Sequence, residues 1–379
     1  MSSPDQRAAK LATRLGFFVA GFGLAGWAPL VPFAKQHLAV DDATLGLLLL
    51  CLGIGSVAAM LLTGVLSARF GSKPIIITSG LGLAAMLPLL SVAATPATLG
   101  TALFAFGAAL GSLDVAVNIH AIEVERAEGR PLMSGFHAQF SIGGFAGSGL
   151  MTLLLAMQVD ALVSAVLCSC LMGAAMVLAA PRLLRASPQQ AGPLIVIPHG
   201  FVVLLAALAG VMFLVEGAML DWGALLLAGT KHLPETQAGI GYILFSIAMT
   251  AGRLGGDAVV SRIGDRAALF WGSSIAIAGF VVLLTVPVAA LAMTGFLLIG
   301  IGASNLVPIL FRRAGTQTRM PIELAVAAVT MVGYAGVLLG PAAIGFVAEF
   351  TSLQTAFWML AALLTIVPLS AHRAGAAQT

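Results

Sequence analysis

Long apolar runs alternate with short polar segments along the whole chain. Each run holds about 20 residues, the length that an α-helix needs to cross the hydrocarbon core of a bilayer, whereas strands of a membrane barrel alternate over about 10 residues. Breaking the runs at proline, glycine and charge clusters predicts 12 membrane-spanning helices, six on each side of a polar stretch at 181–199. The predicted spans are 14–34, 43–66, 74–93, 98–122, 133–157, 161–180, 200–229, 237–260, 267–286, 289–311, 322–348 and 353–371.

The positions of the basic residues orient these spans. With a cytoplasmic N-terminus, the outside loops hold only Lys35 and Lys231, and the other 16 of the 18 basic residues fall on the inside. This is a strong positive-inside asymmetry, and one missed helix would invert every later loop. The pattern therefore predicts an all-α polytopic protein of the bacterial inner (cytoplasmic) membrane, with both termini cytoplasmic.

Composition agrees with this interpretation and excludes other classes. The chain is 60% apolar and 9% charged, with a mean hydropathy of +1.06, whereas soluble domains carry about 25% charged residues. The inside loops account for the net charge of +3, so we expect no nucleic-acid partner. The histidines are dispersed and no phosphate-binding Gly-x-x-x-x-Gly-Lys-Ser/Thr segment occurs, so we expect no metal and no cofactor.

The two halves of the chain resemble each other. The polar stretch contains four prolines and lies at the midpoint, which predicts an N-terminal six-helix bundle over 1–180, a cytoplasmic linker over 181–199 and a C-terminal bundle over 200–379. At an offset of 193 residues, Arg69-Phe70-Gly71 falls on Arg262-Ile263-Gly264. Six-helix halves in parallel orientation are one of the repeat types of membrane transporters.

The loop after the second span, from Gly64 to Lys73, resembles the signature of the major facilitator superfamily, except that Ala68 stands where the signature has aspartate. Four further segments resemble the YbjJ-like branch of its bacterial inner-membrane members, which lies near the fucose-permease-like symporters: 113–125, 133–147, 216–222 and 333–346. The resemblance implies 12 helices in two pseudo-symmetric bundles, a central cavity lined by helices 1, 4, 7 and 10, and alternating access by rocking of the bundles. It implies no particular substrate.

Acidic residues inside spans are functional candidates, because inserting one costs about 2.5–3.5 kcal/mol. Asp114 lies on the fourth span with Asn118 one turn later, and His137 enters the fifth span at a similar depth. We expect these three side chains to converge. Asp114 and His137 either hold or pass a proton, since histidine titrates near neutral pH, or form a polar contact that only locks two helices together.

The seventh span carries two more acids, Glu216 near its middle and Asp221 toward its outer end. They lie about 140° apart around the helix and so cannot both face one cavity wall. Glu216 is the better candidate for binding the coupling proton, or a hydroxylated or cationic solute. Asp221 is a candidate for solute contact or, with Lys231, for an outer-gate ion pair.

Polar and aromatic side chains within the spans complete the predicted solute site. Asn305 on the tenth span lies as deep as Asp114, although it would serve equally to bond a neighbouring helix. Tryptophan and tyrosine stack on rings and sugar faces, but they also form belts at the membrane interface. The predicted solute-binding residues are Trp27, Asn118, Gln139, Asp221, Trp222, Asn305 and Tyr334.

Charges at the inner helix ends predict a cytoplasmic gate. Arg253 and Asp257 stand four residues apart on the eighth span, Arg262 follows, and Arg69 lies in the matching loop of the first half. A solvated helix end would carry the same charges. Ala68 predicts a weaker latch in the first half. The glycine-proline signature of antiporters is absent from the fifth helix, and only the eleventh holds a similar segment.

The sequence therefore predicts a secondary active transporter of a small organic solute, sugar-like or another metabolite, by proton symport; the alternative is a proton-antiport exporter. The solute is expected to be neutral or cationic, because no basic residue is predicted near the centre of a span, Arg253 being assigned to the cytoplasmic side. An enzyme using Ser134, His137 and Ser141 is disfavoured, because one helix holds all three without an orienting group. We expect a monomer in the lipid bilayer, with the solute and H⁺ as ligands.

Overall fold

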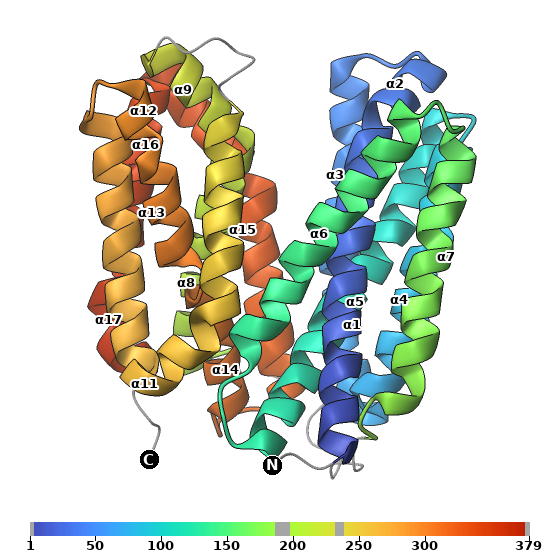
Figure 1. Cartoon of the computed structure of the whole chain (residues 1–379), viewed down its shortest axis with the longest axis horizontal. Helices are drawn as coiled ribbons and strands as arrows, with labels where there is room; N and C mark the ends of the chain where they lie inside the picture. Colours follow the sequence, from blue (N-terminus) through green and yellow to red (C-terminus); the bar gives the residue numbers. More distant parts are fainter. Residues whose placement is uncertain (1–3, 186–197, 232–238, 376–379) are drawn as a thin grey trace. The chain divides into compact units, whose positions relative to one another are not determined.

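The computed structural model describes residues 4–185, 198–231 and 239–375, and helices dominate them (Figure 1). The N-terminal half contains α1 (Pro4–Trp27), η1 (Ala28–Leu30), α2 (Val31–Leu38), α3 (Asp42–Phe70), α4 (Ser72–Ser91), α5 (Pro96–Glu128), α6 (Met133–Ala156), α7 (Ala161–Ala179) and η2 (Ala180–Arg182). The C-terminal half contains α8 (Phe201–Asp221), α9 (Gly223–Lys231), α11 (Ile240–Thr285), α12 (Ala289–Ala292), α13 (Thr294–Ala303), α14 (Leu306–Thr316), α15 (Ile322–Phe350), α16 (Leu353–Leu364) and α17 (Ile366–Gly375).

Eleven helices among the described residues are long and apolar enough to cross a membrane, which confirms the predicted architecture of 12 spans once α11 is divided. α11 joins the predicted eighth and ninth spans. Its backbone leaves the helical region at Gly264 (φ 80°, ψ 162°), a conformation that glycine adopts without a steric penalty. The repeat-related Gly71 between α3 and α4 has nearly the same backbone angles (φ 78°, ψ 165°). The glycine of each Arg-x-Gly segment therefore makes the same turn.

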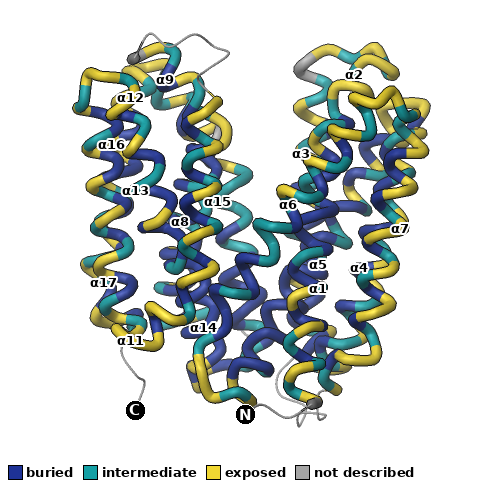
Figure 2. Tube along the Cα trace, in the orientation of Figure 1, coloured by how far each residue is buried: buried dark blue, intermediate teal, exposed yellow. Residues whose placement is uncertain are grey.

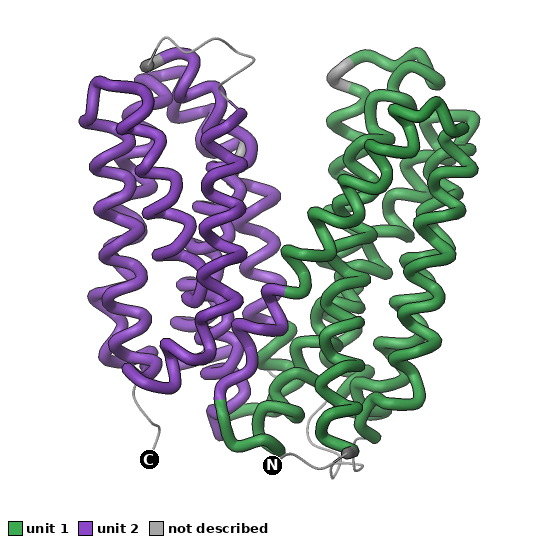
Figure 3. The backbone as a smooth tube through the Cα atoms, viewed as in Figure 1, with its two compact units in different colours: residues 1–130, 139–197, 319–327 green, residues 131–138, 198–318, 328–379 purple. Residues whose placement is uncertain are grey.

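The described chain divides into two compact units (Figure 3). Unit 1 comprises 1–130, 139–197 and 319–327, and unit 2 comprises 131–138, 198–318 and 328–379. Each unit therefore includes a short segment from the other half of the sequence. Most of the predicted linker, residues 186–197, lies outside the described residues, so the division of the chain at that linker stays a prediction.

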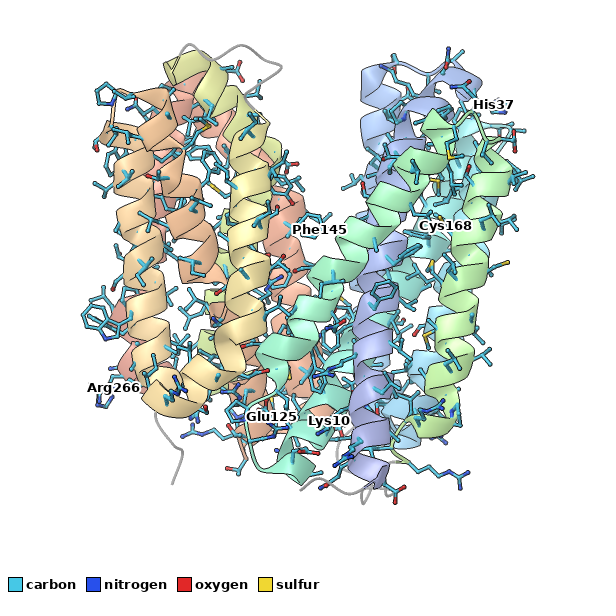
Figure 4. The ribbon with its side chains drawn as sticks, in the orientation of Figure 1. Lys10, His37, Glu125, Phe145, Cys168 and Arg266 are labelled. Carbon is cyan, nitrogen blue, oxygen red and sulfur yellow. The ribbon has the colours of Figure 1, made fainter. Side chains whose placement is uncertain are left out.

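Polar contacts at one end of unit 1 join the starts and ends of its helices as an up-and-down topology requires. Lys10 near the start of α1 pairs with Glu128 at the end of α5, at 3.0 Å. Lys73 at the start of α4 donates to the carbonyl of Leu183, just after α7, at 3.2 Å. Figure 4 shows Lys10 at this end of unit 1 and His37 at the opposite end.

A buried histidine fastens the chain that follows α7 to the same end of unit 1. The Leu184 N–H donates to His120 Nε2 at 2.9 Å, so Nδ1 carries the ring hydrogen and donates to Thr13 Oγ1, also at 2.9 Å. The Thr13 hydroxyl in turn donates to the carbonyl of Ala9. Each polar atom of this chain of hydrogen bonds has a partner, and the neutral ring of His120 is fixed in one tautomer.

Unit 2 gathers charged groups in the same way. Arg312 near the end of α14 donates to Asp265, just after the Gly264 bend, at 2.6 Å. Arg313 donates to the carbonyl of Ala374 in α17 at 3.0 Å. The start of the ninth span and the ends of the tenth and twelfth therefore meet at one end of the unit.

Glycines set the close helix packing in both units. Any side chain at Gly143 of α6 would overlap the backbone of Phe18 in α1. At the repeat-related position, a side chain at Gly336 of α15 would overlap the backbone of Gly210 in α8. These contacts support the packing role of small residues in helix association. Many large apolar residues are instead exposed, Leu369 to 81%, as expected of surfaces that face lipid. Figure 2 colours the exposed residues of both units yellow.

Candidate functional site

A buried ion pair lies within the membrane-spanning part of unit 2. Glu216 on α8 and Arg253 on α11 pair through Oε1 and Nη2, at 3.3 Å, and their side chains are 24% and 7% exposed. Arg253 lies about 16–20 Å from either end of the arm of α11 that precedes Gly264, whereas Glu216 lies about 22 Å from the start of α8 and about 8 Å from its end. Arg253 therefore sits near the middle of its span, and Glu216 lies within the last two turns of α8.

This position places Arg253 away from the inner helix end, and its role in the cytoplasmic gate stays a prediction. The residue precedes the Gly264 bend by roughly 16 Å of helix and pairs with an acid of the seventh span rather than with Asp257 one turn away. The premise that no basic residue lies near the centre of a span was wrong. Periodicity places a residue along its helix, but it does not reveal which neighbouring helix supplies the counter-charge that makes its burial possible.

The tenth span is interrupted near this pair, at Ser304 and Asn305 between α13 and α14. In a continuous helix, the Ser304 carbonyl would accept from the backbone N–H four residues later. That residue is Pro308, which has no N–H. Arg253 supplies the missing donor, because its Nε donates to the Ser304 carbonyl at 3.3 Å.

Two glycines of α11 allow the interrupted segment to approach so closely. A side chain at Gly252 would overlap Ser304, and one at Gly256 would overlap the Asn305 amide and come within 2.8 Å of the Ser134 Cβ. Asn305 Nδ2 donates to the Gly252 carbonyl at 3.2 Å. The Asn305 side chain therefore bonds a neighbouring helix, as the alternative to solute binding predicts.

Asp257 holds the first turn of α6 within unit 2. Its two carboxylate oxygens accept the backbone N–H of Ser134 at 3.0 Å and of Gly135 at 2.9 Å. The first N–H groups of a helix lack partners in their own helix, and a negative charge is favourable there. Asp257 thus acts as a capping residue contributed by a different helix, while the side chains of Arg69 and Arg262 are exposed.

The predicted meeting of three residues near Asp114 is seen in part. Asn118 Nδ2 donates to the Asp114 carboxylate at 3.2 Å and to its carbonyl at 2.9 Å, and both residues are buried in unit 1. His137 belongs to unit 2, where its ring lies 5.6 Å from that of Phe311. The pairing of Asp114 with His137 therefore stays a prediction.

The other predicted solute-binding residues are divided between the units. In unit 1, Trp27 is buried and Gln139 is half-buried on α6. In unit 2, Tyr334 lies with its ring 6.1 Å from that of Phe213, Trp222 is half-buried, and Asp221 is exposed at the end of α8.

Several buried polar atoms of these residues have no hydrogen-bond partner among the described residues. They are the indole nitrogens of Trp27 and Trp222 and the side-chain oxygens of Asn118 and Asn305. Buried polar groups usually have a partner, so such exceptions need an explanation.

Comparison with known proteins shows the family of this chain. The model of the Major Facilitator Superfamily matches residues 14–319. An uncharacterized MFS-type transporter of Yersinia pestis is 49% identical over 96% of this chain and 95% of its own length. The chain belongs to the major facilitator superfamily. It is therefore a membrane transporter and not an enzyme.

Solved structures of the superfamily share the fold at low sequence identity. A crystal structure of the E. coli fucose:proton symporter FucP aligns with a TM-score of 0.80 and 16% identity, covering 98% of this chain and 99% of that one. The proton:xylose symporter XylE aligns with a TM-score of 0.77 and 11% identity, covering 98% and 96%. At such low identities, the structural similarity establishes only the fold of this chain and not its solute or its coupling ion.

Proposed function

We propose that this transporter moves a small neutral organic solute, of the sugar or polyol type, into the cell by proton symport, and that Glu216 carries the proton. The Glu216–Arg253 pair carries this proposal. An ionisable acid within a span is costly, so its presence there points to a function, and Glu216 keeps 24% of its side chain exposed. It is therefore an acid that a proton can reach.

The charge balance of the pair supports a neutral solute. A free buried arginine would favour an anion, but the ionised Glu216 compensates Arg253, so the pair offers a solute no net charge. The buried polar atoms without partners offer hydrogen bonds rather than net charge. FucP and XylE, which share the fold, are described as proton symporters of fucose and xylose.

We further propose that Asp257 acts as the cytoplasmic latch and that Arg262 and Arg69 are further residues of the cytoplasmic gate, at the inner surface of the bacterial cytoplasmic membrane. Its two hydrogen bonds to the start of α6 provide the support. Asp257 would release the α6 turn when the cavity opens to the inside. Both termini are assigned to the cytoplasm by the distribution of basic residues.

Untargeted uptake tests the symport proposal before the solute has been identified. Proteoliposomes containing the purified protein are incubated with a bacterial metabolite extract, with the interior one pH unit more alkaline, and their contents are read by mass spectrometry. We expect a neutral solute to accumulate about 10-fold, because one pH unit corresponds to about 1.4 kcal/mol per proton.

Uptake is also measured with a protonophore and with two variants, so that the result can be interpreted. A protonophore should abolish the accumulation, and the Glu216→Gln variant should only equilibrate the solute. The Asp114→Asn variant reveals whether Asp114, the acid in unit 1, also takes part in proton coupling. Depletion of a solute preloaded into the vesicles under the same gradient would support antiport instead, and accumulation that resists the protonophore would refute proton coupling.

A further inference from the structure

One guanidinium group connects the candidate proton carrier to the interruption of the tenth span. Arg253 Nη2 donates to Glu216 and Arg253 Nε donates to the Ser304 carbonyl, both at 3.3 Å. The guanidinium is planar and rigid, with its donors in a fixed fork. A movement at its Glu216 side therefore also moves the donor at the Ser304 side.

The Ser304 carbonyl has a specific need for this donor. Pro308 removes the N–H that would satisfy it within the helix, and an unsatisfied backbone carbonyl inside a membrane is costly. Gly252 and Gly256 bring the interrupted segment against α11. The segment thus depends on α11 for both its packing and one of its backbone hydrogen bonds.

The charge on Glu216 determines how the guanidinium is held. While Glu216 is ionised, a charge-assisted hydrogen bond attracts the guanidinium toward α8. Once Glu216 is neutral, that attraction falls and the guanidinium is free to settle against other acceptors. The hydrogen bond that closes the gap at Ser304 consequently changes with the charge of an acid on a different helix.

We propose that Arg253 is a positioning residue for transport, which transmits the charge state of Glu216 to the break between α13 and α14. This inference rests on the proposed role of Glu216 and deepens it. Protonation of Glu216 would then loosen the tenth span at Ser304 and Asn305, and loss of the proton would tighten it. The angle between the two halves of that span would change as the transporter opens first to one side of the membrane and then to the other.

Other titratable groups share this environment and dictate the design of the test. Tyr242 on α11 interacts electrostatically with Glu216, Asp221 and Arg253, and His137 interacts with Arg253. A pH titration would change several of these groups together. A fixed-pH comparison of variants isolates Glu216.

Hydrogen exchange at the break tests the proposal. The full-length protein in lipid nanodiscs is labelled at a single pH, and exchange is followed by mass spectrometry in peptides covering 303–309. We expect Glu216→Gln to speed exchange there about 10-fold, the size expected when a charge-assisted hydrogen bond is lost. Arg253→Gln should speed exchange similarly, and adding Glu216→Gln to it should have no further effect.

Controls separate this linkage from general loosening. Arg266→Gln, an exposed arginine on the same helix, should leave the break unchanged, and peptides of α16 should exchange as in the wild type in all variants. If Arg253→Gln does not fold, Arg253→Lys replaces it, since lysine lacks the rigid fork, and the effect of Glu216→Gln should then fall below about 3-fold.

Two results would overturn the proposal: an unchanged break in Glu216→Gln, or an equal effect of Glu216→Gln with and without Arg253. The hydrogen-exchange measurement does not depend on transport activity. Exchange that fails this pattern while uptake stays proton-coupled would refute the linkage alone, and the expected pattern without proton-coupled uptake would refute the symport proposal alone.

Discussion

Replacing Arg253 by glutamine is expected to lower the free energy of unfolding by about 3–5 kcal/mol, because removing one partner of a buried pair leaves the other charge uncompensated. Glu216 would remain inside the span without its counter-ion, and the Ser304 carbonyl would lose its donor. Thermal unfolding of the purified variant in detergent, compared with the wild type, measures the loss.

The double variant provides the sharper comparison. Adding Glu216→Gln to Arg253→Gln removes the uncompensated charge, so most of the lost stability should return. Arg266→Gln should have almost no effect, because its side chain is exposed on the same helix. A double variant no more stable than Arg253→Gln would show that the Glu216 charge is not what makes the loss large.

Gly256→Ala should be the other severe substitution. The new methyl group would overlap the Asn305 amide and lie 2.8 Å from the Ser134 Cβ, so the interrupted span and the start of α6 would both have to shift. Overpacking of this kind typically costs about 1–3 kcal/mol. We expect a corresponding fall in unfolding temperature and a loss of more than about 90% of uptake.

The adjacent Gly255 provides a matched control. A Cβ there meets nothing within 4 Å, and alanine is favoured over glycine in a helix by about 0.5–1 kcal/mol. Gly255→Ala should therefore keep or slightly raise stability and preserve uptake. Equal damage from the two substitutions would mean that helix flexibility, rather than the close approach of Asn305, explains the result.

The sequence predicted the spans well because their signal is local. Each span is a run of apolar residues, and the bends at Gly71 and Gly264 follow from glycine in an Arg-x-Gly segment. The break in the tenth span also left a local sign, since Pro308 lies four residues after Ser304. It was missed because proline is often tolerated within membrane-spanning helices.

The partners within the site were less predictable, because they are distant in the sequence. Arg253 pairs with an acid 37 residues away, and Asp257 caps backbone N–H groups more than 120 residues away. Two charged residues four positions apart on one helix suggest a mutual pair. Here each is engaged by a different helix, which only the packing of unit 2 reveals.

The role of Glu216 as proton carrier is tested most directly by comparing net accumulation with exchange in Glu216→Gln, using the solute that the uptake experiment identifies. A symporter whose proton carrier is permanently neutral should still exchange solute across the membrane but should not concentrate it. We predict exchange within about 2-fold of the wild type with no accumulation under a pH gradient, and full accumulation in the control Glu349→Gln, an exposed acid of α15. Wild-type accumulation by Glu216→Gln would contradict the proposal that Glu216 carries the coupling proton.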